Sequence, residues 1–109
     1  MNEANIDVLT NEQIGFQLIL HSGNARSKVL EALRQSRQGD EARAAALLKE
    51  AEEDLNRAHH IHFQMIQREA SDEKIEFSLI LMHAEDHLMS TLTMKELVKE
   101  LIEWGKQRL

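Results

Sequence analysis

The amino-acid sequence predicts an all-α protein, an antiparallel up-down-up bundle of three helices in a single domain spanning residues 1–109. Proline is absent and glycine occurs only four times. Aromatic residues make up 4% of the chain and tyrosine is absent, so the core must consist mainly of Leu, Ile, Ala and Met, which favour helix over sheet. Apolar residues recur every three and four positions along three stretches, with breaks near Gly39 and Ser71.

The first helix is predicted to begin at Thr10. Thr10 and Gln13 have the spacing of a capping box, in which each side chain bonds the other's backbone N–H. Basic residues followed by Gly39 are typical of a helix end with a left-handed cap. Residues 1–9 show no sustained period, so we expect them to form a flexible tail.

The second helix is predicted from Glu41 to about Glu69, with Asp40 as its N-cap. The short connection before it makes the first two helices antiparallel neighbours. Charged residues of this helix, Asp54 and Arg57 among them, are expected to form a solvated surface. The third helix is expected to be capped by Ser71 or Asp72 and to continue through Trp104. Helices of roughly 28 residues, each about 42 Å long, suit an elongated bundle.

The stretch 78–93 is predominantly apolar but has His83, Glu85, Asp86 and His87 at its centre. On a helix, His83 and His87 are one turn apart and share a face, whereas Asp86 lies on another stripe with apolar neighbours. A helix with apolar residues on nearly every face must be buried on nearly every face, which two companion helices cannot achieve. We therefore expect an oligomer assembled through this third helix.

Charge and composition exclude several classes of protein. The formal net charge is −6 and no basic block occurs, which argues against a nucleic-acid partner. Cysteine is absent, so disulfides, thiolate nucleophiles and cysteine-ligated zinc are excluded. The N-terminus lacks the features of a signal peptide, and every apolar run is too short to span a bilayer. We expect a cytoplasmic protein without direct membrane insertion.

His83 is the candidate reactive group. A neutral imidazole nitrogen can attack phosphorus and form a labile phosphohistidine, although a single histidine on a helix is more often a satisfied structural residue. His87 is placed to orient the His83 ring or to donate to phosphoryl oxygens. One alternative is a zinc- or iron-binding bundle, in which His59 and His62 add ligands to this pair. Another is an oligomeric helical adaptor without phosphotransfer, whose polar core residues only set register.

Asp86 requires a partner, because a carboxylate among apolar neighbours is costly unless it is paired or metal-bound. An Arg or Lys of the same subunit would satisfy it, and so would a bound metal ion. The sequence leaves both possibilities open.

The run His83-Ala-Glu-Asp-His-Leu-Met89 resembles the signature of the lactose/cellobiose-type enzyme IIA of the bacterial phosphoenolpyruvate-dependent sugar phosphotransferase system (PTS). Three further segments, 22–27 (Ser-Gly-Asn-Ala-Arg-Ser), 38–40 (Gln-Gly-Asp) and 58–59 (Ala-His), follow in the family's order and spacing. The resemblance covers roughly residues 14–104, and four ordered matches make coincidence improbable.

The resemblance implies a cytoplasmic, homotrimeric phosphotransferase component. His83 would accept a phosphoryl group from phospho-HPr and pass it to a cysteine of the cognate IIB protein or domain, for uptake of a lactose-, cellobiose- or chitobiose-type disaccharide. Asp86 and its symmetry mates would hold a structural Mg²⁺ on the threefold axis. Two positions depart from the family: Glu85 replaces the usual glutamine, and His62-Phe63 replaces the common Gln-Thr. A carboxylate at position 85 would repel a phosphoryl group unless it is protonated or turned away.

Overall fold

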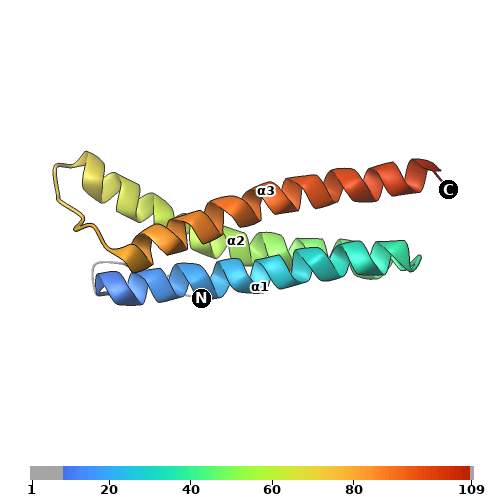
Figure 1. Cartoon of the computed structure of the whole chain (residues 1–109), viewed down its shortest axis with the longest axis horizontal. Coiled ribbons are helices and arrows are strands. Elements are labelled where there is room, and N and C mark those ends of the chain that lie inside the picture. Colours follow the sequence, from blue (N-terminus) through green and yellow to red (C-terminus); the bar gives the residue numbers. More distant parts are fainter. Residues whose placement is uncertain (1–8, 109) are drawn as a thin grey trace.

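The computed structural model describes residues 9–108, in which three helices form an elongated bundle measuring 53 × 26 × 20 Å. These are α1 (Asn11–Arg37), α2 (Glu41–Ala70) and α3 (Leu79–Arg108). Helices α1 and α3 run parallel and α2 runs antiparallel to both, which confirms the predicted up-down-up order (Figure 1). Within residues 9–108, none of the helices is long and apolar enough to cross a membrane. The predicted tail lies outside the described residues except for Leu9, which packs partly buried against the core.

The start of α1 and the turn between α1 and α2 form as predicted. Thr10 Oγ1 accepts from the Gln13 N–H at 3.1 Å and the Thr10 N–H donates to Gln13 Oε1 at 2.9 Å, which completes the capping box. Gly39 adopts a left-handed φ of 90° just after α1. Asp40 Oδ1 accepts from the Arg43 N–H at 3.0 Å and so caps α2. Local side-chain chemistry is therefore sufficient to place these helix ends.

The predicted start of the third helix is wrong, because α3 begins at Leu79 and not near Ser71 or Asp72. The Ser71 hydroxyl donates to a backbone carbonyl one turn back in α2 at 2.7 Å, so it closes α2 and cannot cap α3. Asp72 then turns the chain with a left-handed φ of 66°. Ser78 performs the capping, since its Oγ accepts from the Leu81 N–H at 3.2 Å. Residues 71–78 are therefore a connection, which projects with the end of α2 from one end of the bundle (Figure 1).

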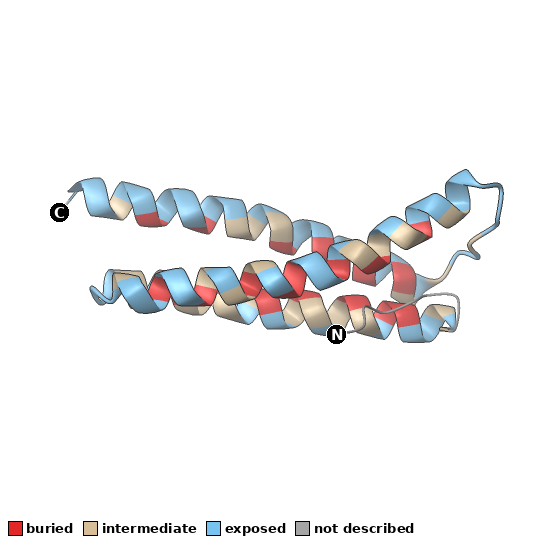
Figure 2. Ribbon diagram, turned by 180° about the vertical axis from the view of Figure 1, so that it is seen from behind, coloured by how far each residue is buried: buried red, intermediate tan, exposed pale blue. Residues whose placement is uncertain are grey.

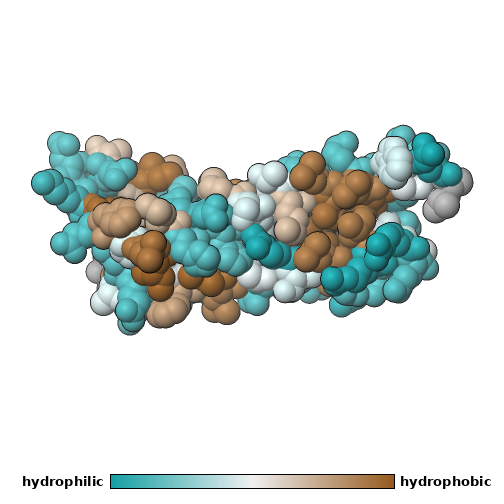
Figure 3. Space-filling model, viewed as in Figure 1, coloured by the Kyte–Doolittle hydropathy of each residue, from teal (hydrophilic) through white to brown (hydrophobic). Residues whose placement is uncertain are grey.

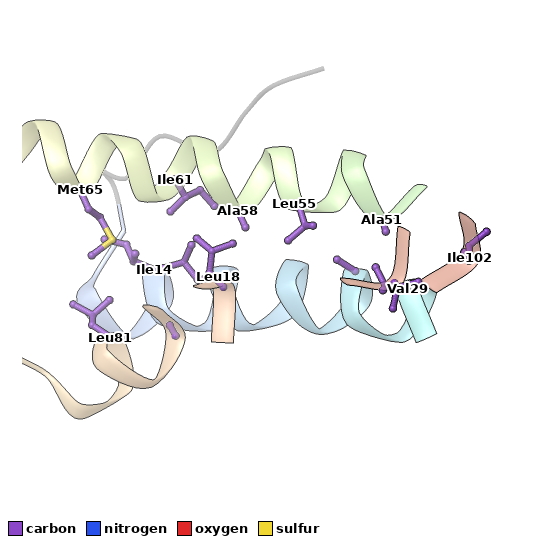
Figure 4. Close-up of a cluster of buried hydrophobic side chains, with 14 residues drawn as sticks. Ile14, Leu18, Val29, Ala51, Leu55, Ala58, Ile61, Met65, Leu81 and Ile102 are labelled. Atoms are coloured by element: carbon purple, nitrogen blue, oxygen red, sulfur yellow. The ribbon is translucent and has the colours of Figure 1, made fainter. Parts of the chain in front are cut away.

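Helix α1 packs along both of the other helices, whereas α2 and α3 contact each other little. Buried residues face the interior of the bundle, and the outward side of α3 is largely exposed (Figure 2). At Gly15 a Cβ atom would lie 3.1 Å from Ile80 Cγ1, so α1 and α3 approach closely there. The principal core side chains, drawn in Figure 4, include Ile14, Leu18, Val29, Leu55, Ile61, Met65, Leu81 and Ile102.

Asp54 does not belong to a solvated surface, because it is only 5% exposed. Its two carboxylate oxygens accept from Lys28 Nζ at 2.6 Å and from Arg57 Nη1 at 3.1 Å. A buried carboxylate needs such partners to offset the loss of hydration. Asp54 is thus a polar link between α1 and α2, and the expectation of a solvated position is corrected.

An apolar stripe runs along the outward side of α3. We define the α3 stripe as Leu79, Met82, Asp86, Met89, Leu97 and Trp104, which are separated by three or four residues up to Met89 and by seven or eight beyond it, that is, by about one or two helical turns. The five apolar members are between 42% and 75% exposed in the single chain. Hydrophobic surface gathers toward both ends of the face shown in Figure 3, with a more polar band between. Exposed apolar surface of this extent marks an interaction site, and assembly as a trimer through it stays a prediction.

Candidate functional site

His83 and His87 lie together on α3, as their spacing predicted. Their ring centroids are 5.9 Å apart and the ring planes meet at 85°, so one ring presents its edge to the other. The His83 side chain is exposed, whereas His87 is half-buried. The pair therefore combines one accessible imidazole with a second one held in place beside it.

Helix α1 forms the wall behind His87. A Cβ atom at Gly23 would lie 4.0 Å from His87 Cε1, an ordinary contact distance. The tight approach between α1 and α3 occurs at Gly15, so Gly23 is not required for helix packing here. Within the described residues, Ser22 Oγ and His87 Nδ1 are buried without a hydrogen-bond partner. The segment 22–27 is thus brought to the histidine pair by the parallel packing of α1 on α3.

Sequence reasoning did not single out Arg26, which bonds the turn of α3 that follows His87. Its Nη2 donates to Ser90 Oγ at 2.6 Å and its Nε donates to Thr91 Oγ1 at 3.3 Å. Both hydroxyls donate in turn to the backbone carbonyl of His87, at 3.3 Å from Ser90 and 2.7 Å from Thr91. The only signal in the sequence for Arg26 was that segment 22–27 matches the family. A sequence pattern on one helix does not show which residues of another helix it contacts.

The surroundings of His87 favour its neutral form. Burial lowers the pKa of the His87 imidazole from its ordinary value of 6.5, and the positive charges of Arg26 and His83 lower it further. The backbone of His87 itself and the Asp86 carboxylate act in the opposite direction, with smaller effects. A neutral imidazole offers one N–H donor and one lone pair. His87 can therefore donate a single hydrogen bond beside His83 without adding a second positive charge.

Glu85 faces α2 and binds His62. His62 Nε2 and Glu85 Oε2 are 2.7 Å apart, and the pair is partly buried between α2 and α3. The two positions that depart from the family therefore meet in one cross-helix contact. Because the carboxylate is bound there, it is turned away from the face that carries His83.

Asp86 is exposed and belongs to the α3 stripe. Within residues 9–108, its carboxylate forms neither a hydrogen bond nor an ion pair, and no three His, Cys, Asp or Glu side chains are grouped to hold a metal ion. His59 and His62 accordingly do not complete a metal site with the pair on α3. One chain supplies a single carboxylate in an apolar setting, which fits a hard divalent cation only if symmetry-related copies supply the others.

Comparison with known proteins identifies the family. The family described as "PTS system, Lactose/Cellobiose specific IIA subunit" matches residues 13–106. The oligo-β-mannoside-specific EIIA component of the PTS of Bacillus subtilis (strain 168) is 58% identical over 108 residues, covering 99% of this chain and 98% of that protein. The chain therefore belongs to the lactose/cellobiose-specific IIA family, and it is a phosphotransferase component of a sugar phosphotransferase system.

Solved structures agree with this assignment. The cellobiose-specific enzyme IIA of Bacillus anthracis is 49% identical, with a TM-score of 0.87 over 95% of both chains. The chitobiose IIA in a complex with HPr, from Escherichia coli, is 39% identical, with a TM-score of 0.78 over 90% of this chain and 95% of that chain. The three-helix architecture is thus that of solved IIA structures.

Proposed function

We propose that this protein is a cytoplasmic phosphocarrier in which His83 accepts a phosphoryl group from phospho-HPr and passes it to a cysteine of the cognate IIB protein or domain. The observation that carries the proposal is the geometry of the histidine pair. An exposed imidazole stands edge-on, at 5.9 Å, to a half-buried one, within the family's signature segment. Membership of the IIA family supplies the class of reaction.

The reaction consists of two balanced displacements. An unprotonated nitrogen of His83 attacks the phosphorus carried by HPr, an N–P bond forms, and the bond between phosphorus and HPr breaks. The IIB thiolate then attacks the same phosphorus, and the His83 nitrogen leaves with its electron pair. No nucleotide is consumed in either step. The protein contributes alignment of the two nucleophiles and stabilisation of the phosphoryl oxygens.

His87 is proposed to assist by donating its single N–H to a phosphoryl oxygen or to the ring of His83. Its buried Nδ1 has no acceptor within the described residues, so we place its proton on Nε2. Because burial and Arg26 keep the His87 pKa low, this donor belongs to a neutral ring. A neutral donor can hold the phosphoryl oxygens without trapping them as tightly as a cation.

HPr is the proposed phosphoryl donor, supported by the Escherichia coli chitobiose IIA solved in complex with HPr. Docking must occur around His83, because a phosphoryl group cannot cross a gap. Gly15 lies against Ile80 and Gly23 against His87, so the intervening turns of α1 run beside His83. Phe16 and Leu20 on those turns are 57% and 54% exposed. They offer the apolar surround that such a contact needs.

The active assembly is proposed to be a homotrimer formed by the α3 stripe. Three copies would bury the exposed apolar residues against one another and would bring three Asp86 carboxylates together. Mg²⁺ bound by these carboxylates would neutralise their charge and act structurally. The alternative of an intrachain Arg or Lys partner finds no support, since Asp86 forms no ion pair in residues 9–108.

The sugar taken up is proposed to be a lactose-, cellobiose- or chitobiose-type disaccharide. The relatives are named for oligo-β-mannoside, cellobiose and chitobiose. Within the proposed relay, this component contacts HPr and IIB and does not contact the sugar. The sugar that is transported is therefore determined by the other components of the system.

Intact-mass spectrometry tests the central proposal. The protein is incubated with phosphoenolpyruvate, Mg²⁺, enzyme I and HPr, and then with the cognate IIB. We expect an acid-labile gain of one phosphoryl group that IIB removes, and no gain in His83→Gln, which should keep the oligomer. Absence of a gain in the wild type, with an active upstream relay, would favour the adaptor hypothesis.

A further inference from the structure

Arg26 connects α1 to the α3 turn that carries His87. The guanidinium group reaches two adjacent hydroxyls, Ser90 at 2.6 Å and Thr91 at 3.3 Å. Thr91 is fully buried and Arg26 is partly buried, so solvent competes little for the bond between them, whereas Ser90 and its bond to Arg26 are exposed. Ser90 and Thr91 both bond the His87 carbonyl, one of them at 2.7 Å. Two hydroxyls thus converge on one backbone oxygen, and Arg26 donates to both hydroxyls.

The direction of this chain of bonds is fixed by chemistry. A guanidinium group can only donate, so each hydroxyl accepts from Arg26 and directs its own proton toward the His87 carbonyl. Thr91 in a helix otherwise divides between two side-chain rotamers, because its hydroxyl is free to bond the carbonyl of the preceding turn in either of them. Hydroxyls that bond back in this way also bend helices. Arg26 therefore selects one rotamer at each position and one local backbone geometry at His87.

We propose that Arg26 is a positioning residue of the phosphoryl-accepting site, which acts through Ser90 and Thr91 to hold His87 against His83. The inference rests on the proposed function of the histidine pair. It assigns to segment 22–27 the role of holding His87 in position. Arg26 does not touch either imidazole through a hydrogen bond in the described residues; its contacts are the two hydroxyls. Apart from the effect of its charge on the His87 pKa, its effect on the reaction is consequently indirect.

The geometry of α1 makes this anchoring effective. A Cβ atom at Gly15 would lie 3.1 Å from Ile80 Cγ1 and one at Gly23 would lie 4.0 Å from His87 Cε1, so α1 passes close to α3 at both positions. Arg26 is one turn beyond Gly23. Helix α1 therefore lies beside the His87 ring at Gly23, and one turn further on it bonds the α3 turn that follows His87. Loss of the arginine leaves the helices packed, because the apolar core around Ala25 and Val29 is unchanged. Loss of Arg26 removes only the bonds that hold the α3 turn following His87.

The test is the rate of phosphoryl acceptance from phospho-HPr in rapid-quench experiments with wild type, Arg26→Gln and Arg26→Lys. Arg34→Gln is the matched control, since Arg34 is an exposed arginine on the same helix that pairs with Glu31. We expect Arg26→Gln to lower the limiting rate by about 10-fold with an unchanged KM for phospho-HPr, because small misplacements of reacting groups cost large factors in rate. Lysine, a point charge without the guanidinium fork, should restore the rate only partly. A raised KM with an unchanged limiting rate would make Arg26 a docking residue and overturn the proposal.

A double-mutant cycle tests the route of action. In a Ser90→Ala/Thr91→Val background, Arg26→Gln should lower the rate by less than about twofold, because the connection is already broken. Full additivity would mean that Arg26 acts directly on phosphate or HPr, contrary to the inference.

A spectroscopic readout separates this inference from the proposed function. At a pH high enough to keep the His87 ring neutral in every variant, so that the lost charge of Arg26 does not change its protonation, the ring resonances of His87 should shift in Arg26→Gln and stay unchanged in Arg34→Gln, even if the wild type accepts no phosphoryl group. His87 resonances that are identical in wild type and Arg26→Gln would overturn the positioning role. If Arg26→Gln fails to fold by circular dichroism, Arg26→Lys and Thr91→Val carry the same comparison.

Discussion

A single contact of Glu85 changes the role that its carboxylate is expected to have. Beside the reactive histidine, a carboxylate would repel the incoming phosphoryl group. In the structure, the Glu85 carboxylate lies 2.7 Å from His62 Nε2 on α2, where it contributes a cross-helix contact. The substitution at position 85 is thus matched by the histidine at position 62.

Glu85→Gln should leave phosphoryl acceptance within about twofold of wild type, since the side chain is engaged by His62 and glutamine can still hydrogen-bond an imidazole. The measurement is the rate of phosphoryl gain from phospho-HPr. Glu85→Ala serves as the comparison, because it removes the contact and should lower the free energy of unfolding by an amount typical of one part-buried polar contact, about 1 kcal/mol. A rate increase of tenfold or more in Glu85→Gln would show that the carboxylate does face the phosphoryl group.

His21 gives the fold a predictable dependence on pH. Burial lowers the pKa of His21 from its ordinary 6.5, while Asp54 opposes this shift and Arg57 adds to it. The unfolded chain therefore binds a proton at His21 more readily than the folded protein does. Titration of His21 does not reduce the free energy of unfolding above pH 6.5. The free energy of unfolding declines as the pH falls from 6.5 through the folded-state pKa of His21. We expect His21→Gln to lose less stability than wild type between about pH 7.5 and about pH 5 in urea unfolding. Equal losses in the two proteins would contradict the assignment.

At the scale of the element, α1 is the helix on which the site depends. It contacts α2 and α3 along its length, and it carries two interior glycines with different surroundings. A Cβ at Gly15 would meet Ile80 at 3.1 Å, whereas at Gly23 it would meet only His87 Cε1 at 4.0 Å. The two positions are a matched pair, with the same residue in the same helix and a different neighbour.

Gly23→Ala should raise the free energy of unfolding by up to about 1 kcal/mol, because alanine is the better helix former and the new methyl group has room. Gly15→Ala should gain less or lose stability, since Ile80 must move to admit the methyl group. Thermal or urea unfolding of both variants measures the difference. If Gly23→Ala is more stable but accepts phosphoryl groups poorly, Gly23 serves the close approach of a partner; a less stable Gly23→Ala would refute the packing argument.

At the scale of the whole molecule, one chain leaves its third helix half covered. The α3 stripe exposes five large apolar residues and a carboxylate that has no partner within residues 9–108. Burial of a single such side chain contributes about 1.5–3 kcal/mol. Self-association is the simplest means of covering this surface, and it would place Asp86 among copies of itself.

Met89→Glu should convert the predicted trimer to monomers, because it places a further carboxylate in the centre of the stripe. Sedimentation velocity measures the change, and circular dichroism should show that the helices persist. Leu20→Glu is the control, with the same kind of substitution on an exposed apolar residue of α1. It should keep the trimer and raise the KM for phospho-HPr, in keeping with a docking surface beside His83. Wild-type protein that sediments as a monomer would refute assembly through α3.

The sequence alone determined the three helices, the caps at Thr10 and Asp40, the turn at Gly39, and the shared face of His83 and His87. These features depend on interactions within a few residues, which local spacing records. It did not determine the late start of α3, the burial of Asp54, the contact between Glu85 and His62, or the connection of Arg26 to Ser90 and Thr91. The late start of α3 follows from local bonds of Ser71 and Ser78, whose alternatives the spacing of polar residues does not separate. Each of the other three features joins residues of different helices. The helical period fixes which side chains share a face, but the rotation and axial offset of one helix against another are decided by the packing of the complete core.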